Sequence, residues 1–221
     1  IGKVGWVGKP FADRLLFGFT YSNMYKEIQT GVRQEAVFGE KHRKGHSLMP
    51  SLEYHKRDLF TKGLDVSLTA NYNYNLTQNI DTVPYQYNWY GEKQYTGSKG
   101  EQSYQDNESK NKNWNGTFKV DYRLSRTQTF TLSHVLTVFE RSNRSDVNST
   151  SAVSDFTVPK KTRKNITGLS YRLMPAERWN FSAFGKYYNQ HSSGLVSQNA
   201  DGIGNYIDMS KHVSALGYGA A

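Results

Sequence analysis

The stretch that decides the fold is Leu-Asp-Val-Ser-Leu-Thr-Ala-Asn-Tyr-Asn-Tyr-Asn, residues 64 to 75. Every second residue, from Leu64 to Tyr74, is apolar or aromatic, and every residue between them is polar. Because successive side chains of a β-strand point to opposite faces, this stretch predicts a strand with one apolar and one polar face. Helical periodicity is hard to find anywhere in the chain.

The same two-residue period recurs along the sequence, which predicts an all-β, antiparallel meander of about nine long strands. Clear repeats lie at 15–22, 114–124, 130–138 and 179–187, and weaker ones at 2–8, 46–56, 163–173 and 208–219.

Composition excludes several classes of protein. The chain has 221 residues, of which 36% are hydrophobic, and its mean hydropathy is −0.75. No stretch approaches the roughly 20 apolar residues of a membrane helix. Aromatic residues reach 14%, which argues against disorder. Cysteine is absent, so disulfides, cysteine zinc sites and thiol chemistry are excluded.

The connections between the predicted strands alternate in length. Bacterial outer-membrane barrels have short periplasmic turns and long extracellular loops, and strands of about 10–13 residues are long enough for a tilted membrane crossing. Short connections are predicted at 9–13, 57–62, 125–129 and 174–178, and long ones at 28–44, 78–112, 142–160 and 190–206.

Aromatic residues lie on the apolar face near the ends of the predicted strands. Such residues form girdles at both edges of a membrane barrel, although cross-strand aromatic pairs also stabilise soluble sheets. The set is Tyr21, Tyr72, Tyr74, Trp114, Tyr122, Trp179 and Tyr187. We therefore predict a segment of a transmembrane β-barrel.

We expect an incomplete barrel, because single-chain bacterial barrels have an even number of strands and nine is odd. The alternation also continues through the last residues, 215–221, without a following turn. Residues 1–221 are thus predicted to be one partial barrel domain without a plug domain.

Two segments resemble the barrel of TonB-dependent outer-membrane receptors, especially those of Bacteroidetes type. They are residues 58–75, Asp-Leu-Phe-Thr-Lys-Gly-Leu-Asp-Val-Ser-Leu-Thr-Ala-Asn-Tyr-Asn-Tyr-Asn, and 171–188, Tyr-Arg-Leu-Met-Pro-Ala-Glu-Arg-Trp-Asn-Phe-Ser-Ala-Phe-Gly-Lys-Tyr-Tyr. The resemblance covers most of the chain, and it lies in the general residue pattern of the strands and in the sequences of the short turns. It implies a barrel of about 22 strands around a plug, energised by the TonB complex. Neither a plug nor a TonB-binding motif is present in this sequence.

The predicted loop at 78–112 is the best candidate for ligand contact. Tyrosine and tryptophan offer large, rigid surfaces with a polar tip, and connections of this length are usually functional or disordered. The alternative is that the rings only pack the loop against itself. The candidate ligand-binding residues are Tyr85, Tyr87, Trp89, Tyr90 and Tyr95.

A basic group lies where a predicted long loop enters a strand, and it consists of Lys160, Lys161, Arg163 and Lys164. At that level of an outer-membrane barrel, cations are attracted to lipopolysaccharide phosphates. A solvated rim is the alternative. The net charge of +9 does not predict nucleic-acid binding, because no recognition helix or RNA-binding sheet motif is found.

Catalytic chemistry is not predicted. The sequence has no nucleophile elbow, no glycine-rich phosphate loop and no His/Asp/Glu cluster with metal-ligand spacing. His42 and His46 are predicted to lie in a solvated basic loop, and His134 is predicted on the apolar face without a catalytic orienter. We therefore expect no enzyme activity, no catalytic residue, no metal and no cofactor.

The function predicted from the sequence is that of a receptor-transporter in the outer membrane of a Gram-negative cell. Its ligand would be a siderophore, haem, cobalamin or a glycan. Its other partners would be outer-membrane lipid, lipopolysaccharide and, through a plug, the TonB complex. A passive pore or structural barrel is the first alternative, and a soluble β-rich adhesin or glycan-binding module is the second.

Overall fold

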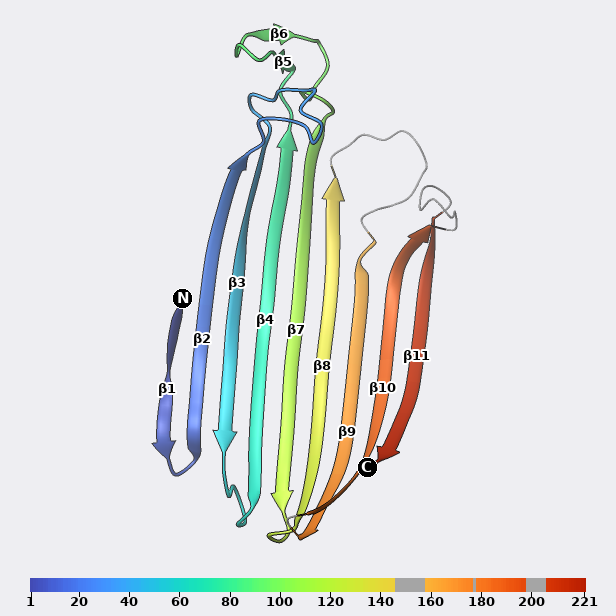
Figure 1. Cartoon of the computed structure of the whole chain (residues 1–221). Coiled ribbons are helices and arrows are strands. Elements are labelled where there is room, and N and C mark those ends of the chain that lie inside the picture. The colour runs from blue at the N-terminus through green and yellow to red at the C-terminus, as the bar shows by residue number, and fades with distance from the viewer. Residues whose placement is uncertain (146–157, 177, 198–205) are drawn as a thin grey trace.

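The protein folds as one layer of antiparallel strands (Figure 1). The structure is a computed structural model that describes residues 1–145, 158–176, 178–197 and 206–221. Nine strands form the main sheet in the order β1-β2-β3-β4-β7-β8-β9-β10-β11. Their bounds are β1 Gly2–Lys9, β2 Ala12–Glu27, β3 His42–Lys56, β4 Leu64–Asp81, β7 Gln105–Arg123, β8 Gln128–Ser145, β9 Lys160–Ala176, β10 Trp179–Ser197 and β11 Tyr206–Ala220.

The prediction of an antiparallel meander of nine strands is confirmed, but several strands are longer than predicted. Strand β7 begins at Gln105 and β10 continues to Ser197, so parts of the loops predicted at 78–112 and 190–206 are strand. His42 and His46 belong to β3, which makes the prediction of a basic loop wrong there. The His42 ring packs beside Tyr25 and the His46 ring beside Tyr74.

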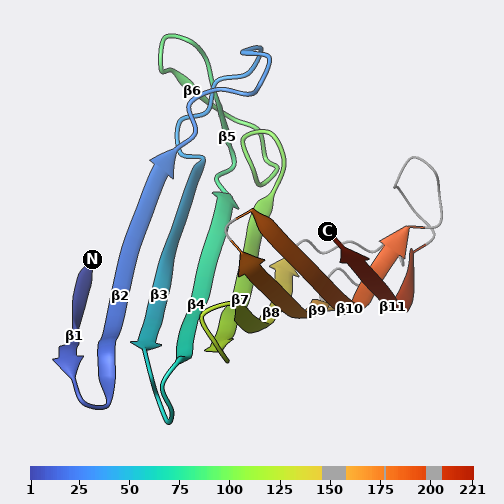
Figure 2. The same ribbon diagram turned by 60° about the horizontal axis from the view of Figure 1, so that its bottom comes forward.

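The connections sort by length to opposite ends of the sheet, as Figures 1 and 2 show. The links β1–β2, β3–β4, β7–β8 and β9–β10 are short and lie at one end. The strand ends that the other four links join lie at the opposite end, where the link between β4 and β7 carries a small hairpin of β5, Tyr85–Tyr87, and β6, Lys93–Tyr95.

Register aligns the alternating patterns of neighbouring strands, so the sheet has two chemically different faces. Leu68 of β4 lies opposite Tyr54 of β3 and Phe118 of β7, and Phe118 in turn lies opposite His134 of β8. We call the side that carries Leu68 the apolar face. The opposite side, which carries Ser67 and its row, is the polar face.

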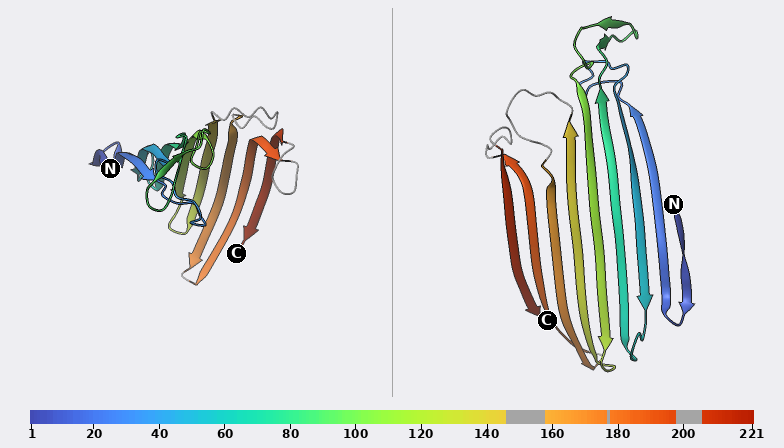
Figure 3. Two further views of the ribbon diagram at one scale, coloured as in Figure 1. Left: turned by 90° about the horizontal axis from the view of Figure 1, so that it is seen from above. Right: turned by 180° about the vertical axis from the view of Figure 1, so that it is seen from behind.

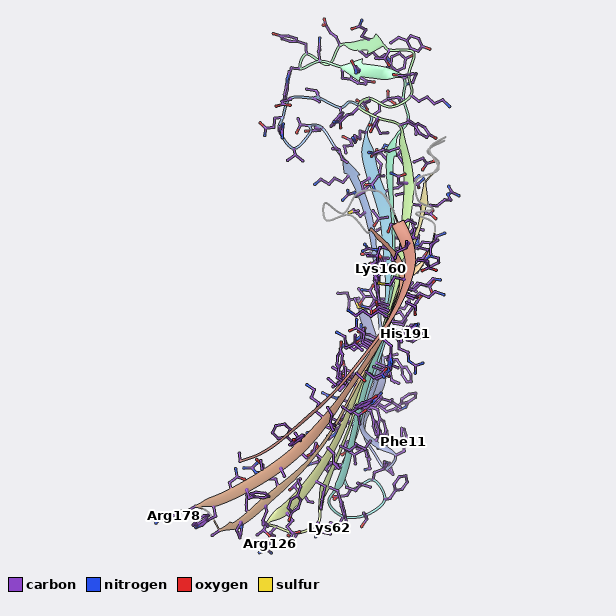
Figure 4. The ribbon with its side chains drawn as sticks, turned by 90° about the vertical axis from the view of Figure 1, so that its right-hand side faces the viewer. Phe11, Lys62, Arg126, Lys160, Arg178 and His191 are labelled. Carbon is purple, nitrogen blue, oxygen red and sulfur yellow. The ribbon has the colours of Figure 1, made fainter. Side chains whose placement is uncertain are left out.

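The sheet has no hydrophobic core of its own. Among the described residues, only Ala12 and Phe38 are buried hydrophobic residues. Large side chains of the apolar face are exposed, including Phe17, Trp114 and Leu216. Strands β1 and β11 are free edges, and the sheet is open rather than closed into a barrel (Figure 3). Seen along its edge, it is a single curved layer with side chains on both sides (Figure 4).

Candidate functional site

Two loops gather above the ends of β2, β3, β4 and β7 (Figure 1). The first is residues 28–41, between β2 and β3, and the second is residues 82–104, between β4 and β7. The bridge pair Thr30–Val37 folds the first loop back on itself, and Val37 also bridges to Tyr87 in the second. The two loops therefore form one unit, which we call the loop pair.

A buried carboxylate at the end of β4 anchors the loop pair. Asp81 is only 1% exposed, and its Oδ1 accepts a hydrogen bond from the backbone N–H of Glu101 at 2.5 Å. The Lys41 ammonium lies 3.3 Å from Asp81 Oδ2. A buried charge requires such partners, so Asp81 joins the second loop to the start of β3.

Glu101 makes the complementary connection in the other direction. Its side chain is buried, and its two carboxylate oxygens accept hydrogen bonds from the backbone N–H groups of Gly39 at 2.6 Å and Glu40 at 2.7 Å. Charge-assisted hydrogen bonds of this kind are short and strong. The first loop is therefore held by a carboxylate that the second loop supplies.

Tyr87 closes the junction between the two loops. Its hydroxyl donates a hydrogen bond to Glu40 Oε1 at 2.7 Å, and that carboxylate raises the pKa of Tyr87 to about 12. The Tyr87 ring packs on Gly39, where a Cβ atom would lie 2.6 Å from the ring. Glycine at position 39 thus lets the ring approach the backbone.

The structure divides the five predicted ligand residues into two groups. Trp89 is 65% exposed, Tyr90 is 91% exposed and Tyr95 is 67% exposed. Tyr87 is committed to the junction described above. Tyr85 is partly buried, with its ring against Tyr95 at 5.7 Å.

The turn that presents Trp89 and Tyr90 is fixed by one asparagine. Asn88 Oδ1 accepts hydrogen bonds from the backbone N–H groups of Tyr90 at 2.9 Å and Glu92 at 3.0 Å. Its Nδ2 donates to Glu92 Oε2 at 2.7 Å. This asparagine turn is a common way of ordering a loop tip, and it holds the exposed rings in place.

A groove of about 400 Å³ runs between the two loops. It is lined by Glu35, Ala36, Val37, Gln86, Tyr87, Asn88, Trp89, Glu101 and Gln102. Among the described residues, the side chains of Glu35, Gln86 and Trp89 make no hydrogen bond, ion pair or ring contact with one another or with any neighbour. These three groups are free to meet a ligand.

The four predicted basic residues of β9 do not act as one group. Lys161 pairs in register with Glu140, and Arg163 pairs with Val138, which places both on the apolar face. Lys160 and Lys164 alternate with them on the polar face. Lys160 lies nearer the loop end of the sheet than His191, and Arg178 lies at the opposite end (Figure 4).

The polar face carries a ladder of asparagines between β4 and β7. Asn115 Nδ2 donates to Asn71 Oδ1 at 3.2 Å, while Oδ1 of Asn73 and Oδ1 of Asn113 are buried without a hydrogen-bond partner. Two arginines extend the ladder, since Arg141 Nε donates to Asn111 Oδ1 and Arg43 Nε donates to Asn79 Oδ1, each at 2.6 Å. The pairs in register are Asn71–Asn115, Asn73–Asn113, Asn75–Asn111 and Asn79–Asn107.

Sequence reasoning missed the residues that organise the loop pair, namely Glu40, Lys41, Asp81 and Glu101. Their contacts join distant parts of the chain, since Glu101 lies 20 residues from Asp81 and 61 residues from Glu40. Acidic residues scattered through loops read as solvated, and only their shared burial marks them as anchors.

Two further features were sought among the residues that the structure describes, namely a cluster of metal-binding side chains and a membrane-spanning helix. No group of three or more His, Cys, Asp or Glu residues that could hold a metal ion occurs there. No helix long and apolar enough to cross a membrane was found in the same residues.

Comparison with protein-family models, with curated proteins and with solved structures found no match to this chain.

Proposed function

We propose that the chain forms part of the wall of an outer-membrane β-barrel that acts as a receptor-transporter. The observation that carries the proposal is the bare apolar face of a sheet that has no core. Soluble monomers rarely expose apolar patches above a few hundred Å². A lipid layer covers such a face while leaving the polar face in water.

The height of the apolar face supports this assignment. Tyr72 and Trp114 stack at its upper edge, with ring centroids 4.4 Å apart, and Phe130 and Tyr171 pair at its lower edge at 4.7 Å. Trp114 and Tyr122, which lies beside Phe130, are eight residues apart on β7. That separation is about 27 Å along the strand, and tilting shortens it to about 22 Å. The apolar band of outer-membrane barrels is about 25 Å tall.

The apolar band also runs obliquely across the sheet. On β2 it extends from Leu15 to Tyr21, and on β10 from Phe181 to Tyr187. The midpoint of the band is Gly18 on β2 and Phe184 on β10. The residue of β10 that lies in register with Gly18, six strands away, is Gln190, which is six residues nearer the long-loop end than Phe184. The path runs through Gly18, Ser51, Asn71, Asn115, Thr137, Lys164 and Gln190.

An offset of one residue per strand corresponds to a definite strand tilt. With about 3.4 Å per residue and about 4.8 Å between strands, the strands are tilted by about 35° from the normal to the band. Barrel strands are typically tilted by 35–45°. The oblique band is therefore what a level membrane would trace on a barrel wall.

The free edges of β1 and β11 require partners if the sheet lies in lipid, because unpaired backbone groups are not tolerated there. Every neighbouring pair in the sheet is antiparallel, so the first and ninth strands run in the same direction. Closure with antiparallel pairing throughout needs an odd number of additional strands. Such a barrel agrees with the resemblance to TonB-dependent receptors.

The loop pair supports a receptor rather than a plain pore. A pore needs no groove with fixed walls, whereas the groove between these two loops is held in shape by the buried carboxylates of Asp81 and Glu101. Its free groups are one carboxylate, one amide and one indole. Such groups suit an uncharged, hydroxyl-rich ligand of glycan type, while the acidic side chains disfavour anionic chelates. Energised uptake through a plug and the TonB complex is implied by the resemblance.

The proposal is tested by ligand binding to the full-length protein purified from membranes. Neutral oligosaccharides serve as probes, and a ferric siderophore and haem serve as charged comparators. Trp89→Ala should weaken oligosaccharide binding at least about tenfold, as the loss of an aromatic anchor does. The control is Phe60→Ala, whose exposed ring lies at the short-turn end. Oligosaccharide binding that survives Trp89→Ala would contradict the assignment of the groove as the ligand site, and a barrel that binds none of the probes would favour the plain pore.

A further inference from the structure

Three cations and one carboxylate form a compact group on the apolar face, directly above the apolar band. Lys112 of β7, Glu140 of β8 and Lys161 of β9 lie side by side in one row of the register. Arg163 lies two residues further along β9, opposite Val138. We call Lys112, Lys161 and Arg163 the rim cations.

Their charge is only partly compensated. Glu140 is shared, with Oε1 3.3 Å from the Lys112 ammonium and Oε2 3.9 Å from the Lys161 ammonium. Arg163 makes no ion pair with the residues that the structure describes. Both lysine side chains are about half exposed. The group therefore has an excess of positive charge available to a ligand.

The position of the rim cations selects the class of ligand. In the next row down, Trp114, Val138 and Arg163 are neighbours, and the Trp114 ring is stacked and exposed. A soluble anion has no apolar part that could cover this apolar surface. A lipid phosphate with acyl chains fits both parts, since the chains cover the band while the phosphate reaches the cations.

The rim cations are far enough apart to contact more than one phosphate group. Lys112 and Lys161 are two strands apart, about 10 Å across the sheet, and Arg163 is about 7 Å below Lys161 along β9. We propose that the rim cations bind the phosphorylated headgroup of an outer-leaflet lipid of lipopolysaccharide type. This inference rests on the proposed function, because it requires the apolar face to lie in lipid.

The strand itself offers a matched control. Lys160 and Lys164 flank the rim residues of β9 but lie on the polar face, in register with Arg141 and Thr137. The double variant Lys161→Gln/Arg163→Gln and the double variant Lys160→Gln/Lys164→Gln remove the same charge from the same strand. Only the first should affect the lipid site.

The experiment uses the full-length protein in a neutral detergent, with bisphosphorylated lipid A as the probe and its dephosphorylated form as comparator. Native mass spectrometry measures the bound fraction as lipid is titrated. Because each cation near a membrane surface contributes about 1 kcal/mol, the rim variant should bind lipid A about 30-fold more weakly. The polar-face variant and wild type should bind it alike, and none should hold the dephosphorylated form as tightly.

Equal loss in both double variants, or no loss in the rim variant, would overturn the inference. The charge-preserving variant Lys161→Arg/Arg163→Lys should keep most of the binding, which separates loss of charge from loss of folding. If the protein stays monomeric in buffer without detergent, the proposed function fails with it. If it needs detergent but ignores lipid A phosphates, only this inference fails.

Discussion

Tyr87 and Glu40 make the junction of the loop pair sensitive to alkaline pH. The pKa of Tyr87 is raised from 10.0 to about 12, mainly by its hydrogen bond to the Glu40 carboxylate. Because the pKa of Tyr87 is higher in the folded than in the unfolded state, its hydrogen bond to Glu40 contributes fully to the stability of the folded protein below pH 10. This contribution is then lost as pH rises through about 12.

We predict that Tyr87 ionises with a midpoint near pH 12, measured as the near-ultraviolet absorbance difference between wild type and Tyr87→Phe. Glu40→Gln removes the negative charge and should return the midpoint towards 10. A wild-type midpoint near 10, or one that Glu40→Gln leaves unchanged, would contradict the hydrogen bond described.

Single residues also show why the basic segment of β9 was predicted only in part. Four cations within five positions read as one patch in a sequence. Once β9 begins at Lys160, alternate residues point to opposite faces. The patch then divides into two pairs with different surroundings, and only the start of the strand decides between the two descriptions.

At the scale of elements, the two faces of one strand should respond differently to the same charge. Leu68 lies in the middle of the apolar band on β4, and Ser67 beside it lies on the polar face. Arginine at the bilayer midplane of a barrel costs about 2–4 kcal/mol. Leu68→Arg should therefore lower the free energy of unfolding by this amount, and Ser67→Arg by much less.

Reversible urea unfolding of the full-length protein in lipid vesicles measures both values. The two substitutions introduce the same side chain at adjacent positions, so backbone propensity is nearly the same for both. Equal costs at the two positions would mean that the two faces of β4 have the same surroundings.

Strand positions were predictable because the apolar band leaves a two-residue period in the sequence. Strand lengths were not, because the upper part of β7 is polar on both faces. Residues 105–113, Gln-Asp-Asn-Glu-Ser-Lys-Asn-Lys-Asn, show no contrast between their two sides. A strand that leaves the band keeps its backbone pairing with β4 and β8 but loses its hydrophobic pattern.

The loop pair was predictable only as aromatic side chains in a long loop. Its organisation depends on contacts between residues 28–41 and 82–104, which no local pattern encodes. The carboxylates of Glu101 and Asp81 accept hydrogen bonds from backbone N–H groups that would otherwise be unpaired. These partners are distant in the sequence, and only the fold brings them together. The sequence therefore gave candidates for ligand contact without separating Trp89 from Tyr87.

At the scale of the whole molecule, the sheet has two unlike faces, and no described element covers either of them. With Ala12 and Phe38 as the only buried hydrophobic residues among those described, its stability has to come from its surroundings. The proposed function supplies those surroundings as lipid on the apolar face and water on the polar face, and the height and slope of the apolar band support that proposal.

The most direct test replaces residues 64 to 75 of β4, one at a time, with cysteine in the full-length protein, after any cysteine outside residues 1–221 has been replaced by serine. Each variant is reconstituted in phosphatidylcholine vesicles and labelled with a fluorophore, and quenching is compared for nitroxide lipids and a water-soluble quencher. Alternating results are predicted, with Val66, Leu68 and Ala70 quenched from the lipid and Ser67, Thr69 and Asn71 quenched from water. Uniform quenching from water along the whole stretch would contradict the account.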